Sequence, residues 1–364
     1  MYADDVTLLC CPASGEPLRL LESTQVAADG EIIDGTLAAG TRRYPIRNGI
    51  PRFVEDVSAN PTWDFKWRVL DAGRGLNFRI LDKGDSAYTT HDIYDRNDHD
   101  GAAYRHMDGG LVLDIGCGVG QYAVKSLLEH NPRKLVAIDL TGGVDVFRKI
   151  VQERYPQLMP RLLIVQASVF ELPFAPATFD YVYSLGVLMH TGQTLTALDR
   201  ACAMVKEGGE INVWIYGSEL LAYNAFEPGR QAALSIATVQ GWIKTVSWPA
   251  RWIKLFREIH HDRAFAIVKF FSSDRMYRLA KRPRFRWIAR VFPTVDHPDY
   301  AYRLINNYDG YINKYDDTWG EHELFPVLRR HSIALLGLGS WRVGLWGRKI
   351  ANFYQAAAGG EPES

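Results

Sequence analysis

Three closely spaced glycines after an apolar stretch are the residues of this chain with the clearest chemical meaning. Residues 111–115 have the composition of a buried strand, glycines follow at positions 116, 118 and 120, and residues 121–130 have helical spacing. Because glycine has no side chain, such a turn lets the backbone approach a ligand closely, and the helix start adds partial positive charge. The segment therefore predicts a site for a nucleotide-type cofactor.

Two aspartates narrow down the kind of cofactor. Asp139 ends a second apolar strand about twenty residues further on, where a carboxylate can hold a ribose diol. Asp114 lies inside the end of the first strand, where it would repel a pyrophosphate but attract the ammonium group of a methionine moiety. The glycine spacing is Gly-x-Gly-x-Gly, whereas nicotinamide and flavin sites read Gly-x-Gly-x-x-Gly. This spacing disfavours an NAD-dependent oxidoreductase.

The glycine segment resembles the first motif of class I S-adenosylmethionine (SAM) methyltransferases, which reads apolar-x-Asp-x-Gly-x-Gly-x-Gly. Later motifs of that family occur in the same order, with substitutions at Met189 and Glu207, at residues 172–174, 179–182, 186–191 and 205–209. A generic strand-turn-helix with glycines kept for packing is the alternative interpretation. It leaves Asp114 and Asp139 unexplained.

The resemblance implies a SAM cofactor, with S-adenosylhomocysteine as the product, and a set of cofactor-binding residues. These are Asp114, Gly116, Cys117, Gly118, Gly120, Asp139, Leu140, Ser168, Val169, Phe170, Ser184, Leu185 and Gly186. Ser168 departs from the family, which usually carries an aspartate there to accept from the adenine amino group. A neutral hydroxyl still accepts a hydrogen bond, so the expected loss is about 1–2 kcal/mol.

Strand-like and helical segments alternate after the glycine turn. Further strands are predicted at 135–139, 162–168, 179–184 and 210–216, then at 332–338 and 341–346 after a helix at 321–330. Alternation of this kind predicts a parallel, doubly wound sheet. The predicted fold class is α/β, a Rossmann-like, seven-stranded, mostly parallel sheet with a small N-terminal β-rich domain and a helical insertion.

Candidate residues for catalysis and acceptor binding follow the later strands. His190 comes after the fourth strand, at the edge of the sheet where α/β ligands bind, and an imidazole titrates near neutral pH. It is a candidate general base; the alternatives are that it caps the next helix or lines the cofactor site. Methyl transfer from a sulfonium needs no metal and no covalent intermediate. Further acceptor-site candidates are Tyr216, Tyr308, Tyr311, Tyr315 and His322.

The sequence divides into six predicted segments. They are a small domain at 1–55, a helical lid at 56–108, the SAM-binding core at 109–217, a helical cap insertion at 218–299, the return of the core at 300–352 and a flexible tail at 353–364. In the lid, Trp63 and Trp67 have i, i+4 spacing, which favours packing of one helix face over ligand stacking.

The N-terminal segment resembles the Trm112-like module, a zinc-ribbon-like domain that precedes some bacterial methyltransferase domains. The resemblance rests on residues 8–14 and 43–51. A tetrahedral zinc needs four nitrogen or sulfur donors. Ser14 occupies one ligand position, residues 35–42 contain no cysteine, and only the adjacent Cys10 and Cys11 remain. We therefore expect the fold of that module without its zinc.

The insertion is strongly basic although the chain is not. Residues 251–290 contain twelve Lys or Arg against three acids, interleaved with aromatic residues. Three interpretations stay open: a cap with a solvated basic face, a site for an anionic substrate such as a nucleotide-linked sugar, or contact with an anionic membrane surface. The whole chain carries 42 Lys or Arg and 42 Asp or Glu, so nucleic acid is not an expected partner.

The predicted function is a SAM-dependent methyltransferase that methylates an oxygen or nitrogen of a small biosynthetic molecule. The alternatives are a nucleotide-sugar or saccharide methyltransferase and, from another class, a non-catalytic methyltransferase-like scaffold. We find no apolar run near 18 residues, no signal-peptide pattern and four cysteines in 364 residues, which together favour the cytoplasm. The oligomeric state is left open, a dimer included.

Overall fold

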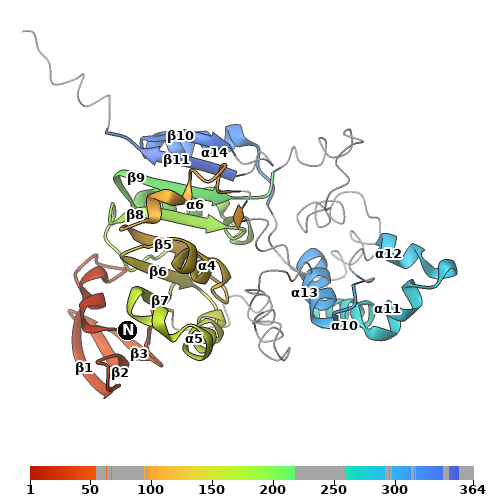
Figure 1. The fold of residues 1–364 in the computed structure, drawn as a ribbon, viewed down its shortest axis with the longest axis horizontal. Coiled ribbons are helices and arrows are strands. Elements are labelled where there is room, and N and C mark those ends of the chain that lie inside the picture. Colours follow the sequence, from red (N-terminus) through yellow and green to blue (C-terminus); the bar gives the residue numbers. More distant parts are fainter. Residues whose placement is uncertain are drawn as a thin grey trace, which may run out of the picture.

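A seven-stranded sheet forms the centre of the computed structural model (Figure 1). The structure describes residues 1–54, 63, 67, 94–95, 97–217, 260–291, 295, 297–312, 315, 317–338 and 344–351. The strands lie in the order β10-β11-β9-β8-β5-β6-β7. Their bounds are β5 Leu111–Ile115, β6 Lys134–Asp139, β7 Leu162–Gln166, β8 Phe179–Leu185, β9 Val205–Trp214, β10 Ile333–Leu338 and β11 Gly344–Lys349.

The sheet is mostly parallel, which confirms the predicted fold class. Strands β5 to β9 pair in parallel, and the last two strands join them antiparallel at one edge. The chain runs outward from β5 through β6 to β7 and then crosses back to β8 on the other side of β5. This reversal places a topological switch point between β5 and β8, and ligands of open α/β sheets bind at the carboxyl ends of strands there.

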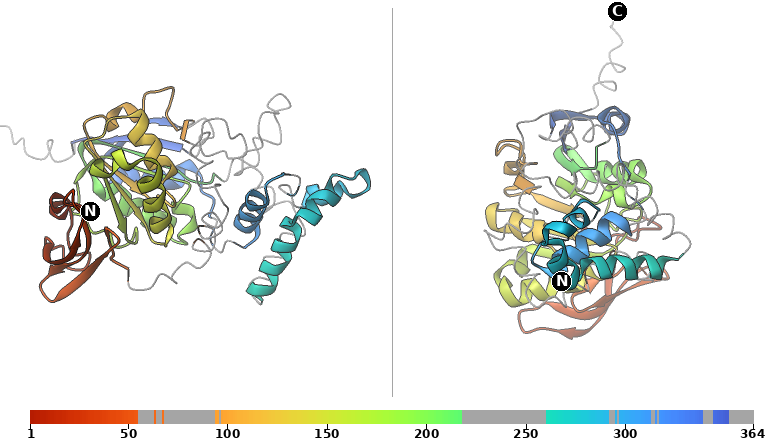
Figure 2. Two further views of the ribbon diagram at one scale, coloured as in Figure 1. Left: turned by 60° about the horizontal axis from the view of Figure 1, so that its bottom comes forward. Right: turned by 90° about the vertical axis from the view of Figure 1, so that its right-hand side faces the viewer.

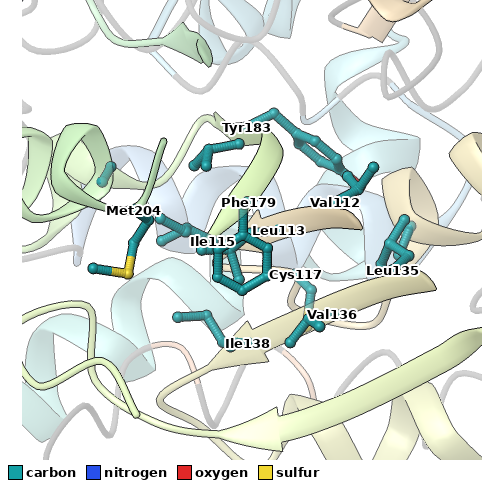
Figure 3. Close-up of a cluster of buried hydrophobic side chains, with 14 of the residues drawn as sticks. Val112, Leu113, Ile115, Cys117, Leu135, Val136, Ile138, Phe179, Tyr183 and Met204 are labelled. Carbon is teal, nitrogen blue, oxygen red and sulfur yellow. The ribbon is translucent and has the colours of Figure 1, made fainter. Parts of the chain in front are cut away.

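The parallel strands are covered on both faces, so they read as nearly continuous apolar runs. Figure 3 shows Val112, Leu113, Leu135, Val136 and Phe179 gathered in this core, and each is at most 1% exposed. The connecting helices are α4 Gln121–Glu129, α5 Gly143–Arg154, α6 Thr194–Met204 and α14 Glu321–Arg330. The short helix η5, Leu188–His190, follows β8.

Several predicted boundaries differ from the structure, among them the end of the strand predicted at 162–168, which stops at Gln166. The turn expected at 206–209 lies within β9, where the register with β8 shifts and Gly208 has φ 77°. A glycine in this conformation lets the strand bulge without ending. The last strand begins at Gly344, later than the predicted 341, and residues 341–343 lie outside the described residues.

The N-terminal residues form a separate four-stranded antiparallel sheet. A 3-10 helix, η1 Ala3–Leu8, precedes the strands β1 Arg19–Val26, β2 Ile32–Ala39, β3 Arg42–Arg47 and β4 Ile50–Pro51. The buried Arg148 of α5 binds both carboxylate oxygens of Glu31 at 2.8 and 3.0 Å. Arg52 binds Asp145 of the same helix. These ion pairs fix the small sheet against α5.

The Cys10–Ser14 turn packs into this small sheet. The Cys11 Sγ lies 3.1 Å from the Tyr44 hydroxyl. Burial raises the pKa of the Cys11 thiol, but hydrogen bonds from Ser14, Tyr44 and the turn backbone outweigh it and lower that pKa to about 7. Among the described residues, no three His, Cys, Asp or Glu side chains group together as metal ligands would. The likeness to the Trm112-like module stays a prediction.

A second body of helices follows β9 in the chain. It contains α10 His261–Ser272, α11 Asp274–Ala280, the 3-10 helix η6 Pro283–Phe285, α12 Trp287–Val291 and α13 Tyr300–Tyr311. These helices share their own buried cluster, centred on Ala264, Val268 and Met276. None of the described helices is both long and apolar enough to cross a membrane. Figure 2 shows that α11 and α12 lie at the end of this body away from the sheet.

Candidate functional site

The glycine turn joins β5 to α4 at the switch point of the sheet. Gly116, Gly118 and Gly120 have φ values of 81°, 54° and 82°, a region that favours glycine. The backbone N–H groups of Gly116 and Cys117 donate to Ile138 O at 2.8 and 2.9 Å, which holds the turn against β6. Helix α4 begins directly after Gly120, so its amino end faces the same place.

Packing explains two of the three glycines. A Cβ at Gly116 would lie 2.3 Å from the Val187 side chain, and one at Gly120 would lie 2.0 Å from the Phe147 ring. The interpretation that these glycines serve packing therefore holds at those two positions. Gly118 differs, because the atoms closest to its Cβ position, at 2.6 Å, belong to Trp67 of the predicted lid segment. Gly118 is itself buried, with the Trp67 indole against it.

Trp67 lies flat over this turn. Its indole also lies 2.8 Å from the Cβ position of Gly143, at the start of α5, and the side chain is 8% exposed. Trp63 is 5.9 Å from Trp67 between ring centroids and 4.9 Å from His190. Sequence spacing favoured packing between the two tryptophans. The structure shows that contact and, in addition, places both rings against the candidate site.

Asp114 is buried beneath the turn. Its Oδ2 atom has no hydrogen-bond partner in the part of the chain that the structure describes. Burial raises the pKa of the Asp114 carboxyl to about 8; the hydrogen bond from the Tyr183 hydroxyl opposes this shift, and the nearby Asp139 carboxylate adds to it. A buried carboxyl with an unused oxygen is suited to receive a cationic group.

A series of buried hydroxyl groups leads from the Asp114 carboxyl into the core. Tyr183 faces Asp114 because the parallel register pairs the two residues across β5 and β8. The Ser126 hydroxyl of α4 lies 3.4 Å from the Tyr183 hydroxyl and 2.8 Å from that of Tyr94. All four residues are at most 1% exposed. The sequence analysis did not identify Tyr183, Ser126 or Tyr94, since only strand register and helix packing bring them together.

We expect Tyr183→Phe to make the stability of the fold more sensitive to pH. Since the Asp114 pKa is raised above its unfolded value of about 4, the free energy of unfolding falls as pH rises from about 4 towards 8. Removing the hydroxyl raises that pKa further and costs about 1.5–3 kcal/mol once the carboxyl ionises. Urea denaturation between pH 6 and 9 measures this.

The matched control for that substitution is Tyr181→Phe. Tyr181 is equally buried and lies two residues earlier on the same face of β8, but it makes no hydrogen bond with Asp114. Loss of the Tyr181 hydroxyl should change the free energy of unfolding by the same amount at every pH. A pH-independent effect of Tyr183→Phe would contradict the role assigned to its hydroxyl.

Asp139 ends β6 beside the glycine turn. Its carboxylate accepts from Gly118 N at 2.8 Å and from the Thr141 backbone and hydroxyl at 2.9 and 2.6 Å. The carboxylate therefore also braces the turn, which the sequence did not indicate. In the next loop the Ser168 hydroxyl accepts from Phe170 N at 3.2 Å and stabilises the turn after β7.

The remaining predicted cofactor residues lie at the same edge of the sheet. The buried Ser184 donates to Ile115 O at 2.9 Å and ties β8 to β5. Gly186 N donates to Trp214 O at 3.0 Å where β8 ends. The others occupy the turn or the strand ends: Cys117, Leu140, Val169, Phe170 and Leu185. The structure thus brings all thirteen predicted cofactor positions together along the carboxyl ends of β5 to β8.

His190 lies on η5, directly after the same strand ends. It is 5% exposed, and its ring meets Tyr216 edge-on with centroids 5.3 Å apart. Its Nδ1 is 2.9 Å from the backbone oxygen of Tyr315. Because a carbonyl oxygen can only accept, Nδ1 carries the hydrogen and the neutral ring has its lone pair on Nε2. That is the tautomer a general base needs.

Residues 315–319 hold this part of the site in place. Asp317 N donates to Met189 O at 3.1 Å, and the Asp317 carboxylate accepts from the Thr194 hydroxyl at 3.0 Å. Trp319 N donates to Tyr216 O at 2.9 Å. These contacts join the loops after β8 and β9 and orient His190. Asp317 and Thr194 had no signal in the sequence, because they lie more than a hundred residues apart.

The other predicted acceptor residues are distributed more widely. Tyr216 and Tyr315 lie beside His190. Tyr308 and Tyr311 are buried in the cluster of the second helical body, where Tyr308 packs edge-on against Phe265. His322 lies on the exposed side of the first turn of α14.

Comparison with known proteins identifies the central part of the chain. Residues 113–213 match a family model described as a methyltransferase domain. The chain is 28% identical over 160 residues to erythromycin 3''-O-methyltransferase of Saccharopolyspora erythraea, covering 42% of this chain and 50% of that protein. It is 32% identical over 108 residues to a tRNA U34 carboxymethyltransferase of Helicobacter acinonychis, covering 28% and 38% of the two chains.

The chain thus spans half the length of these curated relatives or less. Among solved structures, one from Bacillus halodurans that is provisionally named a methyltransferase has 14% sequence identity and a TM-score of 0.36. The similar region covers 68% of this chain and 71% of the Bacillus halodurans chain. Similarity at that score carries no argument about function.

Proposed function

We propose that this chain transfers a methyl group from SAM to an oxygen or nitrogen of a small-molecule acceptor. The observation that supports this most is the convergence of three features at one sheet edge. They are the glycine turn with Trp67 lying against Gly118, the unused oxygen of buried Asp114 and the His190 tautomer with its lone pair on Nε2. The domain match and the O-methyltransferase names of relatives support the same reaction class.

The residues at this edge fit the chemical groups of SAM. Asp114 provides a buried carboxyl for the ammonium group, and Asp139 at the end of β6 provides acceptors for the ribose hydroxyls. Gly118 carries no side chain of its own, and the Trp67 indole lies against it, where it can cover a ligand held at the turn. When bound, SAM supplies a methyl group on a positively charged sulfur.

The protein's own residues then have two tasks. The strand ends hold the acceptor in line with the methyl carbon, and such positioning alone removes much of a bimolecular barrier. His190 accepts a proton at Nε2 from an acceptor hydroxyl or protonated amine, while the Tyr315 carbonyl stabilises the Nδ1–H side of the ring. Trp63 and Tyr216 pack against the imidazole and exclude water from it.

Calorimetry with SAM, S-adenosylhomocysteine and NAD tests the cofactor. We expect micromolar dissociation constants for the first two ligands and no heat with NAD. A panel of phenols, sugars and amines incubated with methyl-labelled SAM then tests the acceptor class. Absence of heat with both SAM and S-adenosylhomocysteine would overturn the proposal. Cofactor binding without transfer to any acceptor would favour the non-catalytic scaffold instead.

A saccharide acceptor is the second candidate within this class. The name of the Saccharopolyspora relative, a 3''-O-methyltransferase, supports an oxygen acceptor. The tRNA-modifying names among the other relatives make RNA the competing acceptor. Including a nucleotide-linked sugar and bulk tRNA in the panel separates the two.

We expect Asp139→Ala to weaken SAM binding about 30- to 150-fold, because it removes a charge-assisted pair of hydrogen bonds worth about 2–3 kcal/mol. Thr141→Val is the control, since it removes one hydrogen bond to Asp139 but keeps the carboxylate. Calorimetry of both variants measures the effect. Equal losses in the two would mean that Asp139 acts only by bracing the turn.

A further inference from the structure

The outer surface of the second helical body carries an unusual concentration of positive charge. Residues 275–291 contain seven Lys or Arg and no Asp or Glu. Six of these side chains are exposed: Arg275, Arg278, Lys281, Arg282, Arg284 and Arg286. We call this surface of α11, η6 and α12 the basic face. Since the whole chain has a formal net charge of zero, the charge is local.

The helices bury their apolar side and leave the cations outside. Met276 and Ala280 of α11 and Ile288 of α12 are at most 5% exposed and belong to the cluster shared with α10 and α13. Asp274, the acid next in sequence to the face, pairs with the buried Arg303. In the described part of the chain, none of the six cations of the basic face is in an ion pair, and Lys281 lies over the Tyr277 ring. Packing of the body does not use their charge.

Two large apolar rings of the second helical body are exposed, and one of them, Trp287, directly follows Arg286 in the sequence. Trp287 is 55% exposed and Phe270 is 50% exposed. Trp287 stacks on no aromatic ring among the described residues. Tryptophan is enriched at the boundary between lipid head groups and acyl chains, and cations beside it are attracted to anionic head groups. Exposed rings next to unpaired cations are the combination that a peripheral membrane surface requires.

The position of the basic face favours a partner with an extended, flat surface over a single strand of RNA, which binds in a groove. Figure 2 shows α11 and α12 at the end of the helical body away from the sheet, where an extended surface can reach them. Proteins that bind single-stranded RNA combine a cationic groove with a row of stacking rings. Here Phe270 and Trp287 belong to different helices, α10 and α12, and do not form a row.

We propose that the basic face docks peripherally on an anionic lipid bilayer, with Trp287 entering the head-group region. The charge of the six cations is complementary to the anionic leaflet, and the proposal does not depend on methyl transfer. None of the candidate cofactor residues belongs to the basic face.

Co-sedimentation of the full chain with vesicles tests the proposal. We expect binding to phosphatidylcholine vesicles that contain phosphatidylglycerol, little binding to phosphatidylcholine alone, and weakening by salt. The triple variant Arg282→Glu, Arg284→Glu, Arg286→Glu should weaken binding about 100-fold or more, since each cation near an anionic surface contributes roughly fivefold. Trp287→Ala should weaken it further at high salt, where the charge contribution is screened.

The control triple variant is Arg42→Glu, Arg43→Glu, Arg47→Glu. It makes the same change of charge on exposed side chains of β3, in the small N-terminal sheet. Circular dichroism verifies that both triple variants are folded. The proposal would be overturned if the two triple variants lost vesicle binding equally. It would also be overturned if the unaltered chain did not bind anionic vesicles. Tighter binding of RNA than of vesicles, lost in the first triple variant alone, would also overturn it in favour of a nucleic-acid surface.

Discussion

His190→Asn is expected to slow methyl transfer by about 10²- to 10⁴-fold, the usual contribution of a positioned general base. The asparagine amide can still donate to the Tyr315 carbonyl as Nδ1 does, but it has no basic nitrogen in place of Nε2. The substitution therefore keeps the tie between the two loops and removes only the proton acceptor. The acceptor identified in the labelling panel is the substrate for this measurement.

The two kinetic constants and a second histidine make the test specific. Since the role proposed for His190 is to accept a proton from the acceptor, kcat should fall while calorimetric affinity for SAM stays within a few-fold. His322→Asn is the control, because that side chain lies exposed on the first turn of α14 and should leave kcat unchanged. An unchanged kcat in His190→Asn would show that the imidazole only lines the site.

Asp114→Asn is expected to weaken SAM binding about 150- to 5,000-fold. The amide has the shape of the carboxyl but no charge, so the ammonium group of the ligand would face a neutral partner in a buried place. Leaving one member of a buried ion pair without its partner costs about 3–5 kcal/mol. The expected loss of SAM affinity exceeds that of Asp139→Ala because Asp139 is less buried than Asp114.

The same residue gives SAM binding a pH dependence with a known sign. The Asp114 pKa of about 8 in the free protein means that the carboxyl must lose a proton when a cation binds. Affinity of the unaltered chain should therefore rise between pH 6 and 8, up to about tenfold per pH unit. Above pH 8 the α-amino group of the ligand begins to lose its own charge. Asp114→Asn should show a flat profile from pH 6 to 8.

Stability provides an independent measurement of the same carboxyl. Because the folded-state pKa is raised, the protonated form stabilises the fold, and this contribution is lost as pH rises from about 4 to about 8. Asp114→Asn should gain stability relative to the unaltered chain by about 1.4 kcal/mol per pH unit across that window. A constant difference between the two proteins would mean that the carboxyl is ionised in the folded state throughout.

Local sequence was sufficient for the parts of the site that depend on backbone conformation. The positive φ values at residues 116, 118 and 120 are accessible mainly to glycine, so the turn is visible in the residue types themselves. Asp114 and Asp139 occupy strand ends, and parallel strands of alternating βα units bring their carboxyl ends to one edge. The fold class and the cofactor edge follow from these two facts.

Contacts between distant segments depended on tertiary structure. Tyr183 meets Asp114 because of the register between β5 and β8, and a shift of one residue would turn it to the other face. His190 receives its orientation from the Tyr315 carbonyl, a backbone atom 125 residues away that carries no signal in the residue type. Tyr308 and Tyr311 matched the expected tyrosine-rich segment, yet they pack into the separate helical cluster.

The sequence by itself thus indicated the residues of the proposed cofactor site, since glycine and aspartate at strand ends are rarely interchangeable with other residues. Only the tertiary structure decided which hydroxyls tune the Asp114 carboxyl, which nitrogen of His190 carries its proton, and which cations of residues 275–286 face solvent. The physical reason is that hydrogen bonding and burial depend on distances across the fold. Neighbouring residue types do not encode those distances.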